Sequence, residues 1–381
     1  MSKRTTRARP NGAKTPPPRN SALPQPSAAD APLGARLGVK IAAFVTLVVV
    51  CAMAGVAYVI HARAKDPKAG KPREPSEEVT PARLAALMSA PHLLFENTDL
   101  GPAYGRVEVV PLNDPGGVRA ITPITCDRVA TAKNVGVCLT INRGVITTYE
   151  GKIFDRSFRV LHTFALPGLP SRARLSPDGH WAAMTVFVSG DNYASATFST
   201  RTSFIDTSTG KNLGNLEQFH VTDGGSTVTS ANRNYWGVTF AADSDHFFAT
   251  LGRGSKIRLI AGSVSSRSAH TIRNGVECPS LSPDQTRIAY KSRVGGTLTA
   301  VKWRLHVVDL RTGADIALAE TRSVDDQVEW LDNNTILYSI LRSETGTAIK
   351  DTYAVPADGS GQPTIYVKGA WSPAVGARTA S

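Results

Sequence analysis

The pentapeptide LSPDG at Leu175–Gly179 occurs again, almost unchanged, as LSPDQ at Leu281–Gln285. Proline holds φ near about −65°, and Asp can hydrogen-bond to the neighbouring backbone, so each copy predicts a tight turn. Residues 180–187, HWAAMTVF, and residues 286–290, TRIAY, follow the two turns. They are rich in the aromatic and β-branched residues that favour strands. The two copies therefore suggest that the chain repeats a whole unit of turn and strand.

Weaker echoes of this turn recur along the chain at 125–127, 176–178, 241–243, 282–284, 331–333 and 372–373. A strand, a tight glycine-containing turn and a second strand are predicted three times, at 202–216, 305–319 and 352–367. One unit therefore has four strands in about 45–50 residues, which is the size of a β-propeller blade. Residues 92–373 hold about six such units.

The segments ARLSPDGHWAAMTVF, PSLSPDQTRIAYKS and LHVVDLRTG resemble the β-propeller repeats of the TolB family, which also occur in prolyl-oligopeptidase-like peptidases. The resemblance covers nearly all of residues 92–373. It implies an all-β fold, a six-bladed propeller whose last blade is completed by strands from both ends of the repeat region. Residues 93–121 and the terminal WSPAVGA would supply those strands.

The family likeness says little about activity. In the TolB family that this chain resembles, a soluble periplasmic protein has an α/β domain ahead of its propeller. This chain has an apolar segment and a stalk at that place. TolB's partners, an outer-membrane lipoprotein and the inner-membrane Tol proteins, are therefore not carried over. A peptidase of the oligopeptidase type needs a G-x-S-x-G motif, which this sequence lacks. Its eight histidines are scattered without metal-site spacing, so we predict no enzyme, no metal site and no cofactor.

The N-terminal region reads as a membrane anchor. Residues 41–60 form a run of twenty residues without a charge, long enough to cross a bilayer as a helix. A cleaved leader is the alternative, because Ala62-Arg63-Ala64 fits a signal-peptidase site. The predicted organisation is a disordered basic tail, a transmembrane signal anchor, a stalk with a short helix from Thr80-Pro81, and a propeller, at 1–36, 37–61, 62–91 and 92–381.

The distribution of charged residues and the cysteines predict on which side of the membrane the N-terminus and the propeller lie. Residues 1–78 hold 13 of the 43 Lys and Arg but 5 of the 31 Asp and Glu. The net charge of +12 thus belongs mainly to the tail, and the rest of the chain has no basic stripe for nucleic acid. Residues 1–40 hold eight Lys and Arg and only one acidic residue, Asp30, which favours a cytoplasmic N-terminus, whereas the five Lys and Arg at 63–73 on the other flank favour the reverse. Cys126 and Cys138 bracket a predicted hairpin and can form a disulfide, although two unrelated buried thiols would fit the spacing as well. A disulfide indicates an extracytoplasmic propeller.

Two sets of residues are candidates for binding. The first lies on predicted innermost strands beside the central channel: Arg172, Arg174, Glu277, Asp326 and Glu329, with Asp325 adjacent. These opposite charges either hold a polar ligand or cation, or simply neutralise each other; the two aspartates are few for calcium. The second set consists of aromatic residues on the segments 190–201 and 220–236, which are longer than a four-stranded blade requires. These residues are Tyr193, Phe198, Tyr235 and Trp236. They form a binding rim or pack these loops onto the body.

Together these features predict a single-pass protein of the cell membrane whose propeller binds a protein, a peptide or an envelope polymer. The alternative is a propeller enzyme of the lyase or hydrolase type with an ion in its channel. A purely structural domain of an envelope complex is a third possibility.

Overall fold

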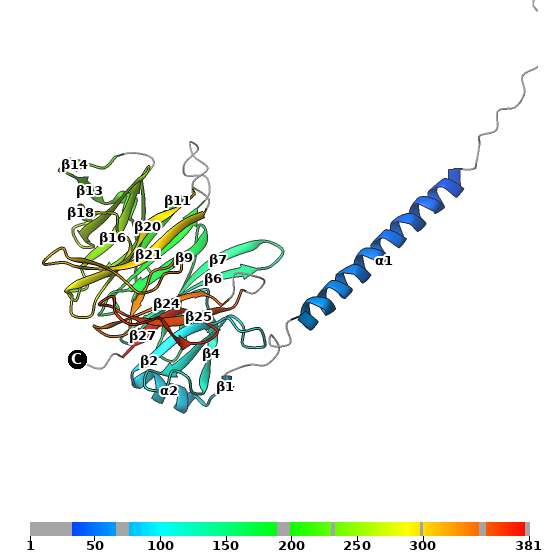
Figure 1. Cartoon of the computed structure of the whole chain (residues 1–381), viewed down its shortest axis with the longest axis horizontal. Coiled ribbons are helices and arrows are strands. Elements are labelled where there is room, and N and C mark those ends of the chain that lie inside the picture. Colours follow the sequence, from blue (N-terminus) through cyan, green and yellow to red (C-terminus); the bar gives the residue numbers. More distant parts are fainter. Residues whose placement is uncertain are drawn as a thin grey trace, which may run out of the picture. The chain divides into compact units, whose positions relative to one another are not determined.

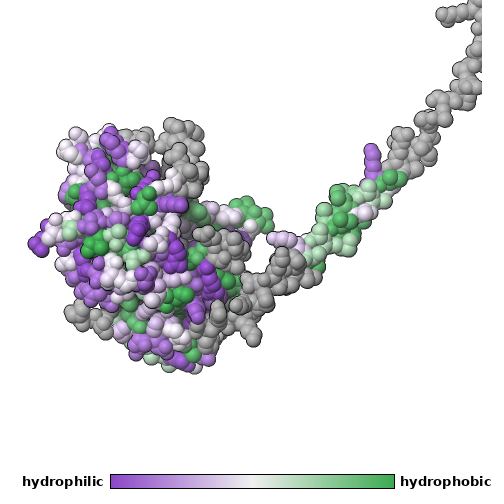
Figure 2. All heavy atoms as spheres, viewed as in Figure 1, coloured by the Kyte–Doolittle hydropathy of each residue, from purple (hydrophilic) through white to green (hydrophobic). Residues whose placement is uncertain are grey.

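The computed structural model describes residues 33–65, 76–188, 199–229, 233–297, 300–342 and 348–377, so most of the predicted tail lies outside the described residues. The chain divides into two compact units, residues 1–69 and 70–381. The first unit contains helix α1 (Leu33–Lys65). Among the described residues, Gly38–Tyr58 of α1 is the one helical segment that is long and apolar enough to cross a membrane, with a mean hydropathy of 2.4. Figure 2 shows apolar side chains along this helix, as the predicted anchor requires.

The second unit is a ring of six β-sheets, the blades of a propeller (Figure 1). In each blade four strands run antiparallel from the channel outwards. Blades 1 to 3 consist of β5 (Arg128–Ala132), β6 (Val135–Arg143), β7 (Thr147–Asp155) and β8 (Val160–Ala165); β9 (Leu169–Leu175), β10 (Trp181–Val188), β11 (Ser199–Asp206) and β12 (Asn212–Asn215); and β15 (Arg233–Phe240), β16 (His246–Arg253), β17 (Lys256–Ser263) and β18 (Ser268–Asn274).

Blades 4 to 6 consist of β19 (Glu277–Leu281), β20 (Arg287–Thr297), β21 (Ala300–Asp309) and β22 (Asp315–Ala317); β23 (Glu329–Trp330), β24 (Thr335–Leu341), β25 (Lys350–Pro356) and β26 (Thr364–Val367); and β27 (Ala370–Gly376), β2 (His92–Asn97), β3 (Arg106–Pro111) and β4 (Arg119–Thr125). The predicted six-bladed, all-β propeller is confirmed. The three predicted strand pairs are the outer hairpins of blades 2, 4 and 5.

Blade 6 closes the ring with strands from both ends of the repeat region. Its innermost strand β27 pairs with β2, so that Val375 lies opposite Leu93 and Ala374 opposite Leu94. Two of the six predicted repeats of the turn are wrong, because neither lies between the first and second strands of a blade. The echo at 372–373 lies inside β27, and the one at 125–127 joins blade 6 to blade 1. No turn links β27 to β2, because these strands come from opposite ends of the repeat region.

The repeated pentapeptide forms the turn between the first and second strands of a blade, and from blade 2 to blade 5 each such turn is hydrogen-bonded to the next. Asp178 N donates to Ser244 Oγ (3.1 Å), Ala242 N to Gln285 Oε1 (2.8 Å) and Asp284 N to Asn333 Oδ1 (3.0 Å). Gln285 stands in the left-handed region, with φ 64°, where the first copy has glycine. Its side chain bonds the preceding blade, which offsets that backbone strain. The motif therefore recurs because neighbouring blades are joined through it.

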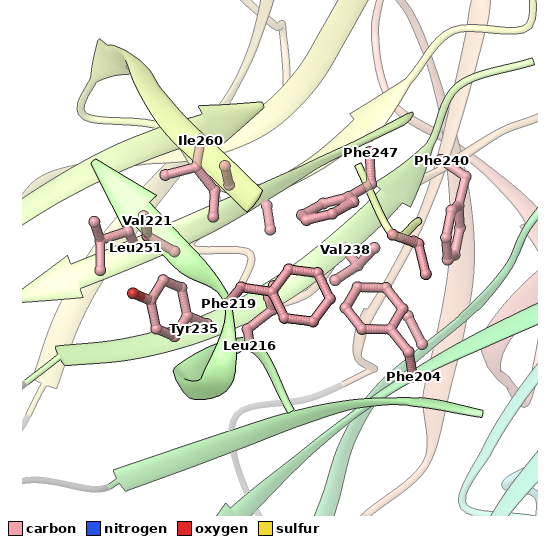
Figure 3. Packing of buried hydrophobic residues seen from close by; sticks show 14 of the residues in the cluster. Phe204, Leu216, Phe219, Val221, Tyr235, Val238, Phe240, Phe247, Leu251 and Ile260 are labelled. Atoms are coloured by element: carbon pink, nitrogen blue, oxygen red, sulfur yellow. The ribbon is translucent and has the colours of Figure 1, made fainter. Parts of the chain in front are cut away.

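The segment 220–236 extends blade 3 and is not a rim loop, which corrects the prediction. After a 3₁₀ turn (Leu216–Gln218), β13 (His220–Asp223) pairs parallel to β18 at the outer edge, and β14 (Ser226–Thr227) pairs with β13. Residues 233–236 begin the innermost strand β15. Figure 3 shows the aromatic core that results, in which the Phe204 ring lies 5.3 Å from Phe247 and 5.5 Å from Phe219 between ring centroids.

Residues 76–91, assigned to the stalk by the sequence, pack on blade 6. Strand β1 (Ser76–Glu78) pairs parallel to β4. Helix α2 (Pro81–Ser89) is capped by Thr80, whose Oγ1 accepts from Arg83 N at 3.3 Å. Three apolar side chains of this helix lie against the strands of blades 6 and 1: Leu84, Leu87 and Met88.

A disulfide joins Cys126 to Cys138, as predicted, with their Cα atoms 5.4 Å apart. It fastens the start of blade 1 to the second strand of the same blade, beside the closing blade. Cys278 is a free, buried thiol, and Cys51 in α1 is free and exposed.

Candidate binding cavity and central channel

Asp326 is the centre of a buried ion-pair cluster in the channel. It lies in the connection to the innermost strand of blade 5 and is 3% exposed. Its Oδ1 is 3.0 Å from Arg128 Nη1 of blade 1 and 3.5 Å from Arg172 Nη1 of blade 2. The next residue, Gln327, donates to Val238 O (2.9 Å) and Pro279 O (2.8 Å) of blades 3 and 4. This short segment therefore links blades 1 to 5 across the axis.

Further ion pairs extend the cluster along the channel. Arg174 pairs with Glu329 and donates to Ser280 Oγ at 3.2 Å. Asp325 pairs with the buried Lys291 and lies 3.7 Å from Arg172. The predicted channel residues Arg172, Arg174, Asp325, Asp326 and Glu329 are thus brought together. Glu277 pairs instead with Arg293 at 2.5 Å, within its own blade.

The pKa values follow from burial and these partners. Burial by itself raises the pKa of Asp326, but Arg128 and Arg172 hold it below its usual value. Burial lowers the pKa of Lys350 to about 8, and Arg128 acts in the same direction. Burial raises the pKa of Glu96 to about 8, helped by Asp127. The charges around Asp326 are therefore held in fixed pairs, whereas burial disfavours the charged forms of Lys350 and Glu96.

These pairs match the alternative in which the channel charges neutralise each other as a structural network. Within the described ranges, no group of three or more His, Cys, Asp and Glu residues is arranged to hold a metal ion. Sequence reasoning missed Arg128, Lys291 and Lys350, because the charged groups near them lie on other blades and come close only when the ring forms.

Of the two aromatic candidates that the structure describes, one is buried and one is half-buried. Tyr235 is 1% exposed and belongs to the blade 3 core, because it faces inwards on a buried strand; its assignment to a binding rim is corrected. Trp236 is half-buried, and its ring lies across Gly252, where a Cβ would meet it at 2.6 Å. Tyr193 and Phe198 lie outside the described residues.

A cavity of about 620 Å³ opens at the end of the channel where the repeated turns lie. We call it the six-blade cavity, because every blade contributes to its wall, for example at Ala132, Leu175, Phe240, Leu281, Trp330 and Val375. The Arg174–Glu329 pair forms part of its wall. Its remaining charged lining residues, Lys133 and Arg156, are both basic, so the lining carries a net positive charge. The sequence did not reveal this cavity, since its lining comes from turns, innermost strands and α2, spread over some 290 positions of the chain from Met88 to Ala377.

Fold and cavity together define a β-propeller with buried ion pairs in its channel and an open, positively charged cavity at one end of it. Its fold is that of a TolB-like six-bladed propeller. The solved structure of TolB from Acinetobacter baumannii has a TM-score of 0.50 and 15% identity, over 76% of this chain and 67% of that one.

Two further solved structures are similar at lower scores. A putative TolB from Agrobacterium tumefaciens has a TM-score of 0.42 and 10% identity, over 74% of this chain and 91% of that chain. A chain of a nidogen/laminin complex has a TM-score of 0.49 and 10% identity, over 76% of this chain and 100% of that chain. No protein-family model and no curated protein matches the chain.

Proposed function

We propose that this chain is a membrane-anchored binding protein of the cell envelope, with its propeller outside the cytoplasm. The six-blade cavity takes an acidic segment of a protein or peptide partner. The observation that carries the proposal is the contrast between the two parts of the channel: its charges are paired, whereas the cavity at its mouth is open and its lining has a net positive charge.

The size and lining of the cavity support a peptide segment as its occupant. Its volume of about 620 Å³ lies within the range of pockets that enclose small ligands or a few side chains. Apolar walls such as Phe240, Leu281 and Trp330 surround the fixed Arg174–Glu329 pair, and mixed linings of this kind orient a ligand. Lys133 is an exposed residue at a hairpin turn, where it can attract acidic groups from solution.

Reversing the charge of the cavity lining should weaken partner capture. A photo-cross-linking residue in place of Asn134 reports on the cavity in intact cells. We expect Lys133→Glu combined with Arg156→Glu to reduce the cross-linked product several-fold, since both changes repel an acidic segment. Lys211→Glu, on the exposed outer turn of blade 2, is the matched control and should leave the product unchanged. Equal yields from all three proteins would exclude the cavity as the binding site.

The disulfide tests the proposed side of the membrane. When thiols are blocked in intact cells before lysis, a non-reduced digest should contain the Cys126 and Cys138 peptides linked, because an extracytoplasmic space is oxidising. Cys278 should be found free. If Cys126 and Cys138 are both recovered as blocked thiols, the propeller lies in a reducing compartment and the proposed topology is wrong.

A further inference from the structure

Apolar side chains are exposed on the loops that join the second and third strands of three neighbouring blades. Five residues share this feature, with exposed fractions of 49%, 59%, 48%, 108% and 79%: Leu341 of blade 5, Leu100 and Tyr104 of blade 6, and Val145 and Ile146 of blade 1. We call them the apolar arc. Val145 and Ile146 form the tip of the β6–β7 hairpin, which projects from the propeller in Figure 1 and ends in apolar atoms in Figure 2.

Contacts between these loops make the arc continuous. Arg342, next to Leu341, pairs with Asp99, next to Leu100, at 3.5 Å. Gly105, next to Tyr104, accepts a hydrogen bond from Cys126 N at 3.2 Å. Asp127 then pairs with Arg143 at 3.1 Å, two residues before Val145. The intervening charges are therefore neutralised in pairs, and the apolar side chains are left as the exposed feature.

The arc lies on the face opposite the six-blade cavity. Strands alternate in direction within a blade, so the loop between the second and third strands is at the other end from the turn between the first and second. The cavity is lined by the latter turns, for example at Lys133 and Pro283. The propeller therefore has a charged, hollow face and an apolar-edged face.

A lipid bilayer is the surface that is always within reach of this arc. Ten residues, 66–75, separate α1 from β1 and can extend over at most about 36 Å. Strand β1 pairs with β4 in blade 6, the middle blade of the arc, with Ser76 opposite Arg119. The seven residues of β4 from there to the arc's end of the blade measure about 23 Å. The linker is therefore long enough for the arc to reach the membrane.

We propose that the apolar arc inserts into the interface of the bilayer that α1 spans, with the hairpin tip Val145–Ile146 deepest. Two adjacent β-branched side chains exposed at a hairpin tip gain free energy on leaving water, and exposed apolar patches of this kind mark membrane or protein contacts. The short linker keeps the membrane at a high effective concentration. The six-blade cavity then faces away from the membrane, towards soluble partners. This inference rests on the membrane anchoring proposed above.

Depth-dependent quenching tests the insertion. The full chain with Cys51→Ala and Ile146→Cys carries an environment-sensitive fluorophore at position 146, since Cys278 is buried and the other two cysteines are bonded. It is reconstituted in vesicles of phosphatidylethanolamine and phosphatidylglycerol that contain an acyl-chain quencher. The matched control carries the label at Asn134→Cys, an exposed turn on the opposite face. A third protein carries it at the natural Cys51 of α1.

We expect the lipid quencher to act several-fold more strongly at position 146 than at 134, and aqueous iodide to act in the reverse order. Adding Val145→Asp should abolish the lipid quenching at 146. Quenching at Cys51 but not at 146, with 146 open to iodide, would overturn the insertion and leave the anchor in place. Shielding of 146 from both quenchers would also overturn it, and would assign the arc to a second copy or a protein partner. No quenching at Cys51 would refute the anchor itself.

Discussion

Removal of residues 369–381 is expected to prevent the propeller from folding stably at 25 °C. The deletion takes away β27, the innermost strand of blade 6, together with the buried side chains of Ala374 and Val375. Ser372 is lost as well, whose Oγ accepts from Val129 N of blade 1 at 3.1 Å. Blades 1 and 6 then face each other across a gap lined with apolar groups. The expected loss exceeds about 5 kcal/mol, the lower end of the total stability of a typical domain.

Deletion of residues 378–381 alone is the matched control, because it keeps every described strand. The far-ultraviolet circular dichroism and thermal unfolding of the two truncated proteins give the comparison. The shorter deletion should melt like the full chain, and the longer one should show no cooperative transition. A protein without residues 369–381 that melts like the control would show that ring closure does not stabilise the fold.

Asp326→Asn is expected to destabilise the propeller by about 3–5 kcal/mol, since it leaves two buried guanidinium groups without their shared carboxylate. Arg128 and Arg172 have side chains 12% and 10% exposed, so water can replace the lost partner only poorly. Chemical denaturation at neutral pH measures the effect. Asp243→Asn is the matched control: its pair with His246 is exposed at both ends, and it should cost less than about 1 kcal/mol.

The pH dependence gives an independent check on Asp326. Its pKa in the folded protein is below the usual value of 3.8, so the carboxylate stabilises the fold above pH 3.8. This contribution disappears as the pH falls through the lowered pKa. The difference in stability between the natural protein and Asp326→Asn should therefore be constant near neutrality and shrink below pH 3.8. If Asp326→Asn costs no more than Asp243→Asn at neutral pH, the channel pairs do not stabilise the ring, and those charges are available to a ligand.

The blades and their number could be predicted from the sequence, because they depend on local chemistry. A Pro-Asp turn followed by β-branched residues specifies a hairpin wherever it occurs, and its repetition specifies a propeller. The Cys126–Cys138 pairing and the start of helix α2 at Thr80-Pro81 likewise depend on neighbouring residues. So does the apolar segment of α1. Each of these predictions is confirmed, since no distant part of the chain needs to be placed first.

The binding surfaces depend on distant residues, and the tertiary structure decided them. Tyr235 seemed to belong to a loop, because the sequence does not show that residues 220–227 add strands to the outer edge of blade 3. Residues 233–240 form strand β15, in which successive side chains point to opposite faces of the sheet, and the side chain of Tyr235 points into the core. The six-blade cavity draws several residues from almost every blade and two from blade 5, and the Asp326 cluster joins groups up to 198 positions apart. What the sequence by itself determined is the repeated blade; how the ends of six blades converge is decided only when the ring closes and its curvature brings those side chains together.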